Sequence, residues 1–75
     1  MNREQVVEKY GELLADWYCV EAYIHDESLY YRYDAAEPVT EPGQISFKKI
    51  TDTSSEPIYV SVLEFHEAQK GDKLK

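Results

Sequence analysis

The start of the chain follows the pattern of an amphipathic helix. Apolar side chains recur three or four positions apart, with polar and charged side chains between them. The apolar positions are Val6, Val7, Tyr10, Leu13, Leu14 and Trp17. Asn2 and Gln5 have the spacing of a capping box, in which each side chain accepts a hydrogen bond from the other residue's backbone N–H. We therefore expect a helix over residues 2–16 that begins at an Asn2 cap.

After this helix the apolar residues recur at every second position, which is the period of a strand with one buried face. The pattern predicts strands over residues 18–25 and 29–34, joined by a short turn into a hairpin. The register that we expect pairs Ile24 with Leu29, Tyr23 with Tyr30, Ala22 with Tyr31, Glu21 with Arg32 and Val20 with Tyr33. It brings an aromatic pair and an opposite-charge pair together on one face, and a slip of one residue would lose both.

The second half of the chain predicts two more strands and a loose end. Strands over residues 45–51 and 58–65 follow a Pro/Gly-rich loop at 37–43 and are joined by a polar turn. Residues 69–75 hold one large apolar side chain, Leu74, so we expect a disordered polar tail. The predicted fold is a single α+β domain over residues 1–68. In it the N-terminal helix packs on one side of a four-stranded antiparallel sheet, in the order α-β-β-β-β with two hairpins.

Length and composition narrow the class of protein. With 75 residues and 8.8 kDa the chain forms one domain at most. No apolar run approaches the roughly 20 residues of a membrane span, and Met1 is followed by a polar, charged stretch where a signal peptide would be apolar. The single cysteine, Cys19, cannot form an internal disulfide. We therefore expect a cytoplasmic protein without membrane contact, of the small acidic kind that bacteria, phages and mobile elements encode.

The net charge of −7 belongs to the first part of the chain. Residues 1–44 hold ten acids and three bases, whereas residues 45–75 hold five of each. Glu4, Glu8, Glu12 and Asp16 recur at every fourth position, so on a helix they form an acidic stripe about 6 Å apart. No lysine stands four residues after any of them to offset the repulsion. The stripe fits either an ordinary solvated helix face or a surface that docks on a basic partner protein.

A second candidate surface is aromatic. The expected register places Tyr23, Tyr30 and Arg32 on the sheet face away from the helix, and Tyr59, Leu63 and Phe65 join them if the last strand shares that side. Such a face fits cross-strand pairing on a solvated sheet, a homodimer contact or a contact with another protein. Stacking of nucleic-acid bases also needs a positive groove, and the scarcity of cations argues against direct nucleic-acid binding.

Catalytic and metal chemistry have little support in the sequence. His25-Asp26-Glu27 and Glu64 with His66 and Glu67 contain groups that can bind metals, but neither set has the ligand spacing of a known metal site. Cys19 has no basic neighbour to activate it, so we interpret it as a small apolar side chain. We expect a non-enzymatic protein without cofactor or metal. Its acidic stripe would dock on a basic partner as a regulator, inhibitor or immunity-type protein; the alternative is an assembly protein that self-associates through the aromatic face.

Overall fold

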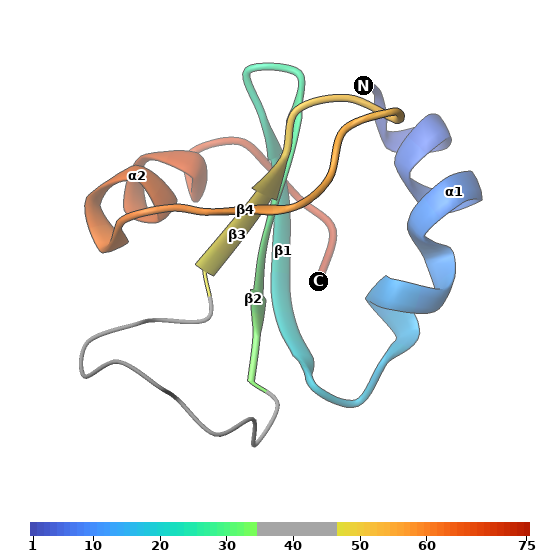
Figure 1. The fold of residues 1–75 in the computed structure, drawn as a ribbon, viewed down its shortest axis with the longest axis horizontal. Helices are drawn as coiled ribbons and strands as arrows, with labels where there is room; N and C mark the ends of the chain where they lie inside the picture. The colour runs from blue at the N-terminus through green and yellow to red at the C-terminus, as the bar shows by residue number, and fades with distance from the viewer. Residues whose placement is uncertain (35–46) are drawn as a thin grey trace.

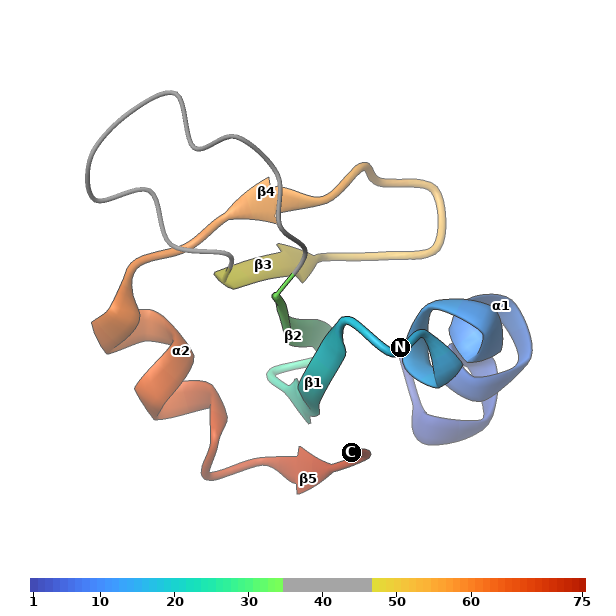
Figure 2. The ribbon, with the colours of Figure 1, turned by 90° about the horizontal axis from the view of Figure 1, so that it is seen from below.

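The computed structural model describes residues 1–34 and 47–75, and its elements form three layers (Figures 1 and 2). Within these residues the sheet has five antiparallel strands in the order β4-β3-β2-β1-β5, with α1 on one face and α2 on the other. The elements are α1 (Arg3–Ala15), β1 (Cys19–His25), β2 (Ser28–Tyr33), β3 (Phe47–Ile50), β4 (Ile58–Tyr59), α2 (Val62–Ala68) and β5 (Asp72–Lys73). The expected α+β class is confirmed, and the predicted loop at 37–43 lies outside the described residues. None of the described helices is long and apolar enough to span a membrane.

Helix α1 begins as the sequence predicts. The Asn2 side chain accepts a hydrogen bond from the Gln5 backbone N–H at 2.8 Å, and the Gln5 side chain accepts one from the Asn2 N–H at 3.1 Å. Val6 is fully buried, whereas Val7 is 51% exposed and Trp17 is 89% exposed. Trp17 differs from the expectation because the helix ends at Ala15 and the chain turns away, so that this residue no longer belongs to the apolar helix face.

The β1–β2 hairpin confirms four of the five expected pairs. Ile24 pairs with Leu29, and the three following pairs towards the open end of the hairpin are also those predicted. The expected pair of Val20 with Tyr33 is wrong, because an irregularity between Cys19 and Glu21 brings Cys19 opposite Tyr33. One extra residue in one strand of an antiparallel pair shifts the register of everything beyond it.

The turn of this hairpin contains two residues in the left-handed region. Asp26 has φ 47° and Glu27 has φ 62°, the backbone that a two-residue turn needs to match the twist of the flanking strands. Glycine or asparagine normally fills such positions, so the sequence contains no strong signal for this turn type.

The two faces of the sheet carry separate cores, because successive residues of a strand point to opposite sides. The core under α1 consists of Val6, Cys19, Ala22, Leu29, Tyr31 and Ile50. The core under α2 consists of Tyr23, Tyr30, Phe65 and Ala68, with Phe47 and Val60 packed against it. The sheet therefore has buried residues on both faces, so the face away from α1 is not open to solvent or to a partner as expected.

The predicted strand over residues 58–65 is replaced after Tyr59 by helix α2. Ser61 is the N-cap, and its hydroxyl oxygen accepts a hydrogen bond from the Glu64 backbone N–H at 3.1 Å. Phe65 and Ala68 are both buried and lie three residues apart, which is helical spacing. The sequence does contain a signal for this start, since serine followed three residues later by glutamate is typical of a helix N-terminus.

The expected disordered tail at residues 69–75 is also not what the structure shows. Strand β5 pairs with β1, and the Leu74 N–H donates to the Ala22 carbonyl at 2.8 Å. Leu74 also packs against the core under α1, and Arg3 binds Asp72, so apolar, backbone and ionic contacts together hold the segment. Gly71 makes the approach feasible, because any side chain there would collide with the carbonyl oxygen of Ile24.

A pair of substitutions in α2 tests the helix against the predicted strand. Phe65→Ala is expected to lower the free energy of unfolding by about 3–5 kcal/mol, since Phe65 is 2% exposed. Leu63→Ala is expected to change it by less than about 0.5 kcal/mol, since Leu63 is 79% exposed. Urea unfolding measures both, and Phe65→Leu supplies a milder variant if the alanine variant is unfolded. In a strand, residues 63 and 65 would share one face, so equal losses at the two positions would contradict α2.

Candidate functional site

The outer face of α1 carries three carboxylates without a partner. Glu4, Glu8 and Glu12 are exposed, and none of them makes a hydrogen bond or ion pair within the part of the chain that the structure describes. The two cations of the same helix are bound elsewhere. Arg3 Nη1 lies 3.3 Å from a carboxylate oxygen of Asp72, and the Lys9 ammonium donates to the Thr53 backbone carbonyl. We call Glu4, Glu8 and Glu12 the acidic helix face.

The acidic helix face is neither straight nor purely polar. Tyr10 has non-helical angles, φ −113° and ψ 19°, so a kink separates Glu12 from Glu4 and Glu8. Arg3, Glu4, Val7 and Glu8 line a shallow hollow on the helix surface. Val7 is half exposed there and adds an apolar contact point between two carboxylates.

Asp16, the fourth member of the predicted stripe, is used inside the chain. The Tyr33 hydroxyl donates to one of its carboxylate oxygens at 2.7 Å, and the Tyr18 backbone N–H donates to the other at 2.9 Å. These hydrogen bonds, that of Tyr18 first, hold the pKa of Asp16 below its usual value. Since both carboxylate oxygens are engaged in closing the turn between α1 and β1, we leave Asp16 out of the acidic helix face.

The predicted aromatic interface is covered by α2. Tyr23, Tyr30 and Phe65 are 7%, 6% and 2% exposed, and the rings of Tyr23 and Phe65 meet edge to face at 5.8 Å. The expectation of a free aromatic face is therefore wrong. The register puts Tyr59 on the opposite side of the sheet, where its ring lies 5.2 Å from the Lys48 ammonium. Of the residues expected on this face, Arg32 remains on the α2 side with part of its surface exposed.

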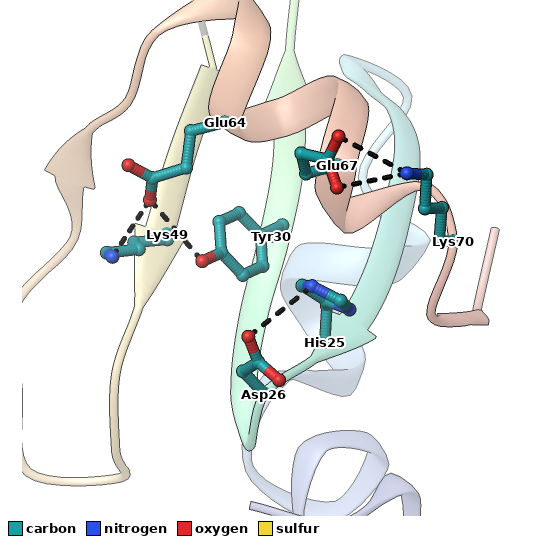
Figure 3. A network of polar contacts seen from close by, with 7 residues as sticks. All are labelled: His25, Asp26, Tyr30, Lys49, Glu64, Glu67 and Lys70. Atoms are coloured by element: carbon teal, nitrogen blue, oxygen red, sulfur yellow. Dashed lines mark hydrogen bonds and ion pairs between the residues drawn. The ribbon is translucent and has the colours of Figure 1, made fainter.

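A polar network links α2 to the sheet (Figure 3). One carboxylate oxygen of Glu64 accepts from the Lys49 ammonium at 2.8 Å and from the Tyr30 hydroxyl at 3.3 Å. The hydrogen bond to Glu64 raises the pKa of Lys49, and burial raises the pKa of Tyr30. Both groups therefore keep their protons at neutral pH and neither is activated as a base or nucleophile. Through these two contacts Glu64 of α2 binds Tyr30 of β2 and Lys49 of β3, which holds the helix on the sheet.

The Cys19 thiol and the His25 imidazole also show no arrangement that would support catalysis or metal binding among the described residues. Cys19 is 1% exposed in the core under α1, and burial raises the pKa of its thiol, so the reactive thiolate is disfavoured. His25 lies 3.4 Å from Asp26 at the hairpin turn (Figure 3). No group of three or more His, Cys, Asp and Glu side chains that could hold a metal ion occurs among the described residues.

One exposed surface was not predicted from the sequence. Four apolar residues of β4 and the first turn of α2 are between 48% and 79% exposed: Ile58, Tyr59, Val62 and Leu63. We call them the β4–α2 patch. The signal available in the sequence was their close succession. This succession predicts a strand over residues 58–65 with Tyr59 and Leu63 on the outer sheet face, because a short apolar run does not distinguish a strand from a helix.

A pH titration of stability distinguishes Asp16 from the exposed acids. Its pKa is lower in the folded chain than its ordinary value of 3.8, so its stabilising contribution is present above that value and is lost as the pH falls through the folded-state pKa. We expect Asp16→Asn to be less stable than the wild type at neutral pH, with the difference shrinking from about pH 5 to about pH 2. Denaturant unfolding at each pH measures this.

Two further points sharpen this test. The pKa of Asp52 is also lowered, by hydrogen bonds from Ser54, so part of the acid dependence survives in the variant. Glu12→Gln, which removes an unpaired charge from the same helix, is the control. Parallel stability curves for wild type and Asp16→Asn across the acid range would show that the hydrogen bonds to Asp16 do not stabilise the fold.

Comparisons with protein-family models, with curated proteins and with solved structures give no match to this chain. Function therefore has to be argued from the chain's own surfaces.

Proposed function

We propose that the protein is a small non-enzymatic binding domain whose acidic helix face docks on a basic surface of a partner protein, with a regulatory or inhibitory outcome. One observation carries the proposal. Three exposed carboxylates on one helix have no bound cation within the described residues, while Arg3 and Lys9 of that helix are directed to Asp72 and Thr53. An ordinary solvated helix usually offsets such charges with cations one turn away.

The energetics indicate how such a face would work. An exposed ion pair contributes only about 0.2–1 kcal/mol, so three of them do not by themselves make a stable complex. Their role is to attract and orient a basic partner, since charge complementarity mainly raises the association rate and excludes wrong partners. The half-exposed Val7, in the hollow between Glu4 and Glu8, supplies the apolar contact that such a complex also needs.

A matched pair of triple variants tests this proposal. The test variant is Glu4→Gln, Glu8→Gln and Glu12→Gln. The control is Glu27→Gln, Asp34→Asn and Glu56→Gln, which changes the net charge equally at exposed positions outside α1. We expect affinity for a partner captured by the wild type to fall about tenfold or more in the test variant, and much less in the control.

The salt dependence of the same complex is the second measurement. Exposed charges are screened within about 8 Å at physiological ionic strength, so wild-type affinity should fall as salt rises, and the test variant should show a weaker dependence. Equal affinity of the two triple variants at low salt would refute docking through the acidic helix face.

A second candidate function is self-association as an assembly protein, and the β4–α2 patch favours it. The aromatic face first expected to serve this role is buried, but Ile58, Tyr59, Val62 and Leu63 are exposed apolar residues that follow one another closely along the edge strand β4 and the first turn of α2. Several large exposed apolar side chains in one region favour a protein contact there.

Light scattering separates the two candidates. Self-association through the β4–α2 patch would give a mass above 8.8 kDa that persists at high salt, because apolar contacts are not screened. Leu63→Glu should then return the protein to a monomer without loss of fold, since Leu63 is 79% exposed. A monomeric wild type at high concentration would remove this candidate and leave docking of the acidic helix face standing.

A further inference from the structure

Arg32 carries a guanidinium group that has no acceptor among residues 1–34 and 47–75. It lies on β2 between Glu21 of β1 and Phe47 of β3, on the face covered by α2. Its Nε is buried and has no hydrogen-bond acceptor. No ion pair or hydrogen bond joins any nitrogen of this side chain to another group within the described residues. Since Nε is the one buried nitrogen without a partner, the two terminal nitrogens reach solvent.

The neighbouring acid does not satisfy this arginine. Glu21 stands directly opposite in the register, and the sequence analysis paired the two charges. In the structure a carboxylate oxygen of Glu21 accepts instead from the Gln69 side-chain amide of the α2 C-cap at 3.3 Å, and no ion pair within 4.0 Å joins Glu21 to Arg32. The polar side-chain contact of Glu21 is therefore with the C-terminal end of α2 and not with Arg32.

The chain's other arginine shows the contrast. Arg3 is more than half exposed, yet its Nη1 lies 3.3 Å from both carboxylate oxygens of Asp72 and also approaches the Lys73 carbonyl. Arg32 is the less exposed of the two and has no acceptor. A partly buried cation without a partner is costly in a protein interior, and in a chain with 15 acids its isolation requires an explanation.

We infer that Arg32 is a binding site for an oxyanion, either a carboxylate or a phosphate group, that approaches the sheet beside Phe47. The guanidinium is a planar fork whose donors match two oxygens of such a group. Phe47, opposite Arg32 in the register and stacked on Phe65 at 4.4 Å, places an apolar ring beside the site, and a charged hydrogen bond is stronger in such a less polar environment.

The surrounding charges limit the ligand to a single anionic group. Lys49 is bound to Glu64, and the Lys48 ammonium lies over the Tyr59 ring on the other face of the sheet. Among the described residues this face therefore offers a polyanion such as a nucleic-acid strand few unpaired cations, Arg32 and the exposed Lys73 of β5, in a chain of net charge −7. An acidic side chain, a chain-terminal carboxylate or a phosphate ester fits this site.

The presence of only two arginines makes the test direct, because a ¹H–¹⁵N spectrum then holds two side-chain Nε–H signals. Sodium acetate and sodium phosphate are titrated separately into the wild-type protein, with sodium chloride at matched ionic strength as the control. We expect the Arg32 signal to shift saturably with at least one oxyanion, while the Arg3 signal moves no further than it does in chloride. The two arms show whether the site takes a carboxylate or a phosphate.

Variants make the assignment specific. Arg32→Lys should weaken the effect of the anion on the Phe47 amide signal about tenfold or more, because an ammonium cannot make the two parallel hydrogen bonds of a guanidinium. Arg3→Lys should leave it unchanged. The wild-type titration needs no variant, so a folding defect in Arg32→Lys does not remove the test.

Two results would overturn the inference. One is the absence of any saturable shift of the Arg32 signal with acetate and with phosphate. The other is a shift of that signal in anion-free Glu21→Gln as large as saturating anion produces in the wild type, which would identify Glu21 as the internal partner of Arg32.

Discussion

The pairing of β1 with β2 places alternate residues of two central strands into two separate cores. Leu29 and Tyr31 point under α1, while Tyr30, between them, points under α2. A slip of one residue would exchange the two sets, so the register of this hairpin decides what each helix packs against. The other elements pack around this hairpin. Strand β3 pairs with β2, β5 pairs with β1, and each helix covers one face of the sheet (Figure 2).

The local parts of this fold could be predicted from the sequence, and the parts that depend on distant contacts could not. The Asn2–Gln5 capping box and most of the hairpin register follow from residues a few positions apart. The sequence does not predict helix α2, because residues 58–65 form a short, mainly apolar run that fits a buried strand as well as a buried helix. The burial of this helix also depends on a tyrosine face that is itself ambiguous. A tyrosine ring suits a core and a wet surface almost equally, so the pattern did not show that a second helix covers Tyr23 and Tyr30. Strand β5 depends on Leu74 and Gly71, which contact residues of β1 that lie about 50 positions earlier in the chain.

The candidate sites show the same division. The four-residue spacing predicted that Glu4, Glu8 and Glu12 lie exposed on the helix, and all three are exposed. It misplaced Asp16, because the helix ends there and the hydroxyl of Tyr33, brought in by the hairpin, binds the carboxylate. The contacts of Arg3 with Asp72 and of Lys9 with Thr53 could not be predicted either, because these partners lie far along the chain. In the same way the register predicted that Glu21 and Arg32 are neighbours, but the hydrogen bond of Glu21 to Gln69, which lies 48 positions further along the chain, could not be predicted.

The two helices divide the surface by the sign of its unsatisfied charge. On the α1 side the cations are bound internally and the carboxylates are left over, so that side attracts basic groups. On the α2 side the carboxylate of Glu64 accepts from Lys49 and that of Glu21 accepts from Gln69, while the partly buried guanidinium of Arg32 has no acceptor within the described residues. A net charge of −7 describes neither side by itself. Because the sheet separates the two faces and screening acts over about 8 Å, the charge on one face has little effect on a charged group that approaches the other.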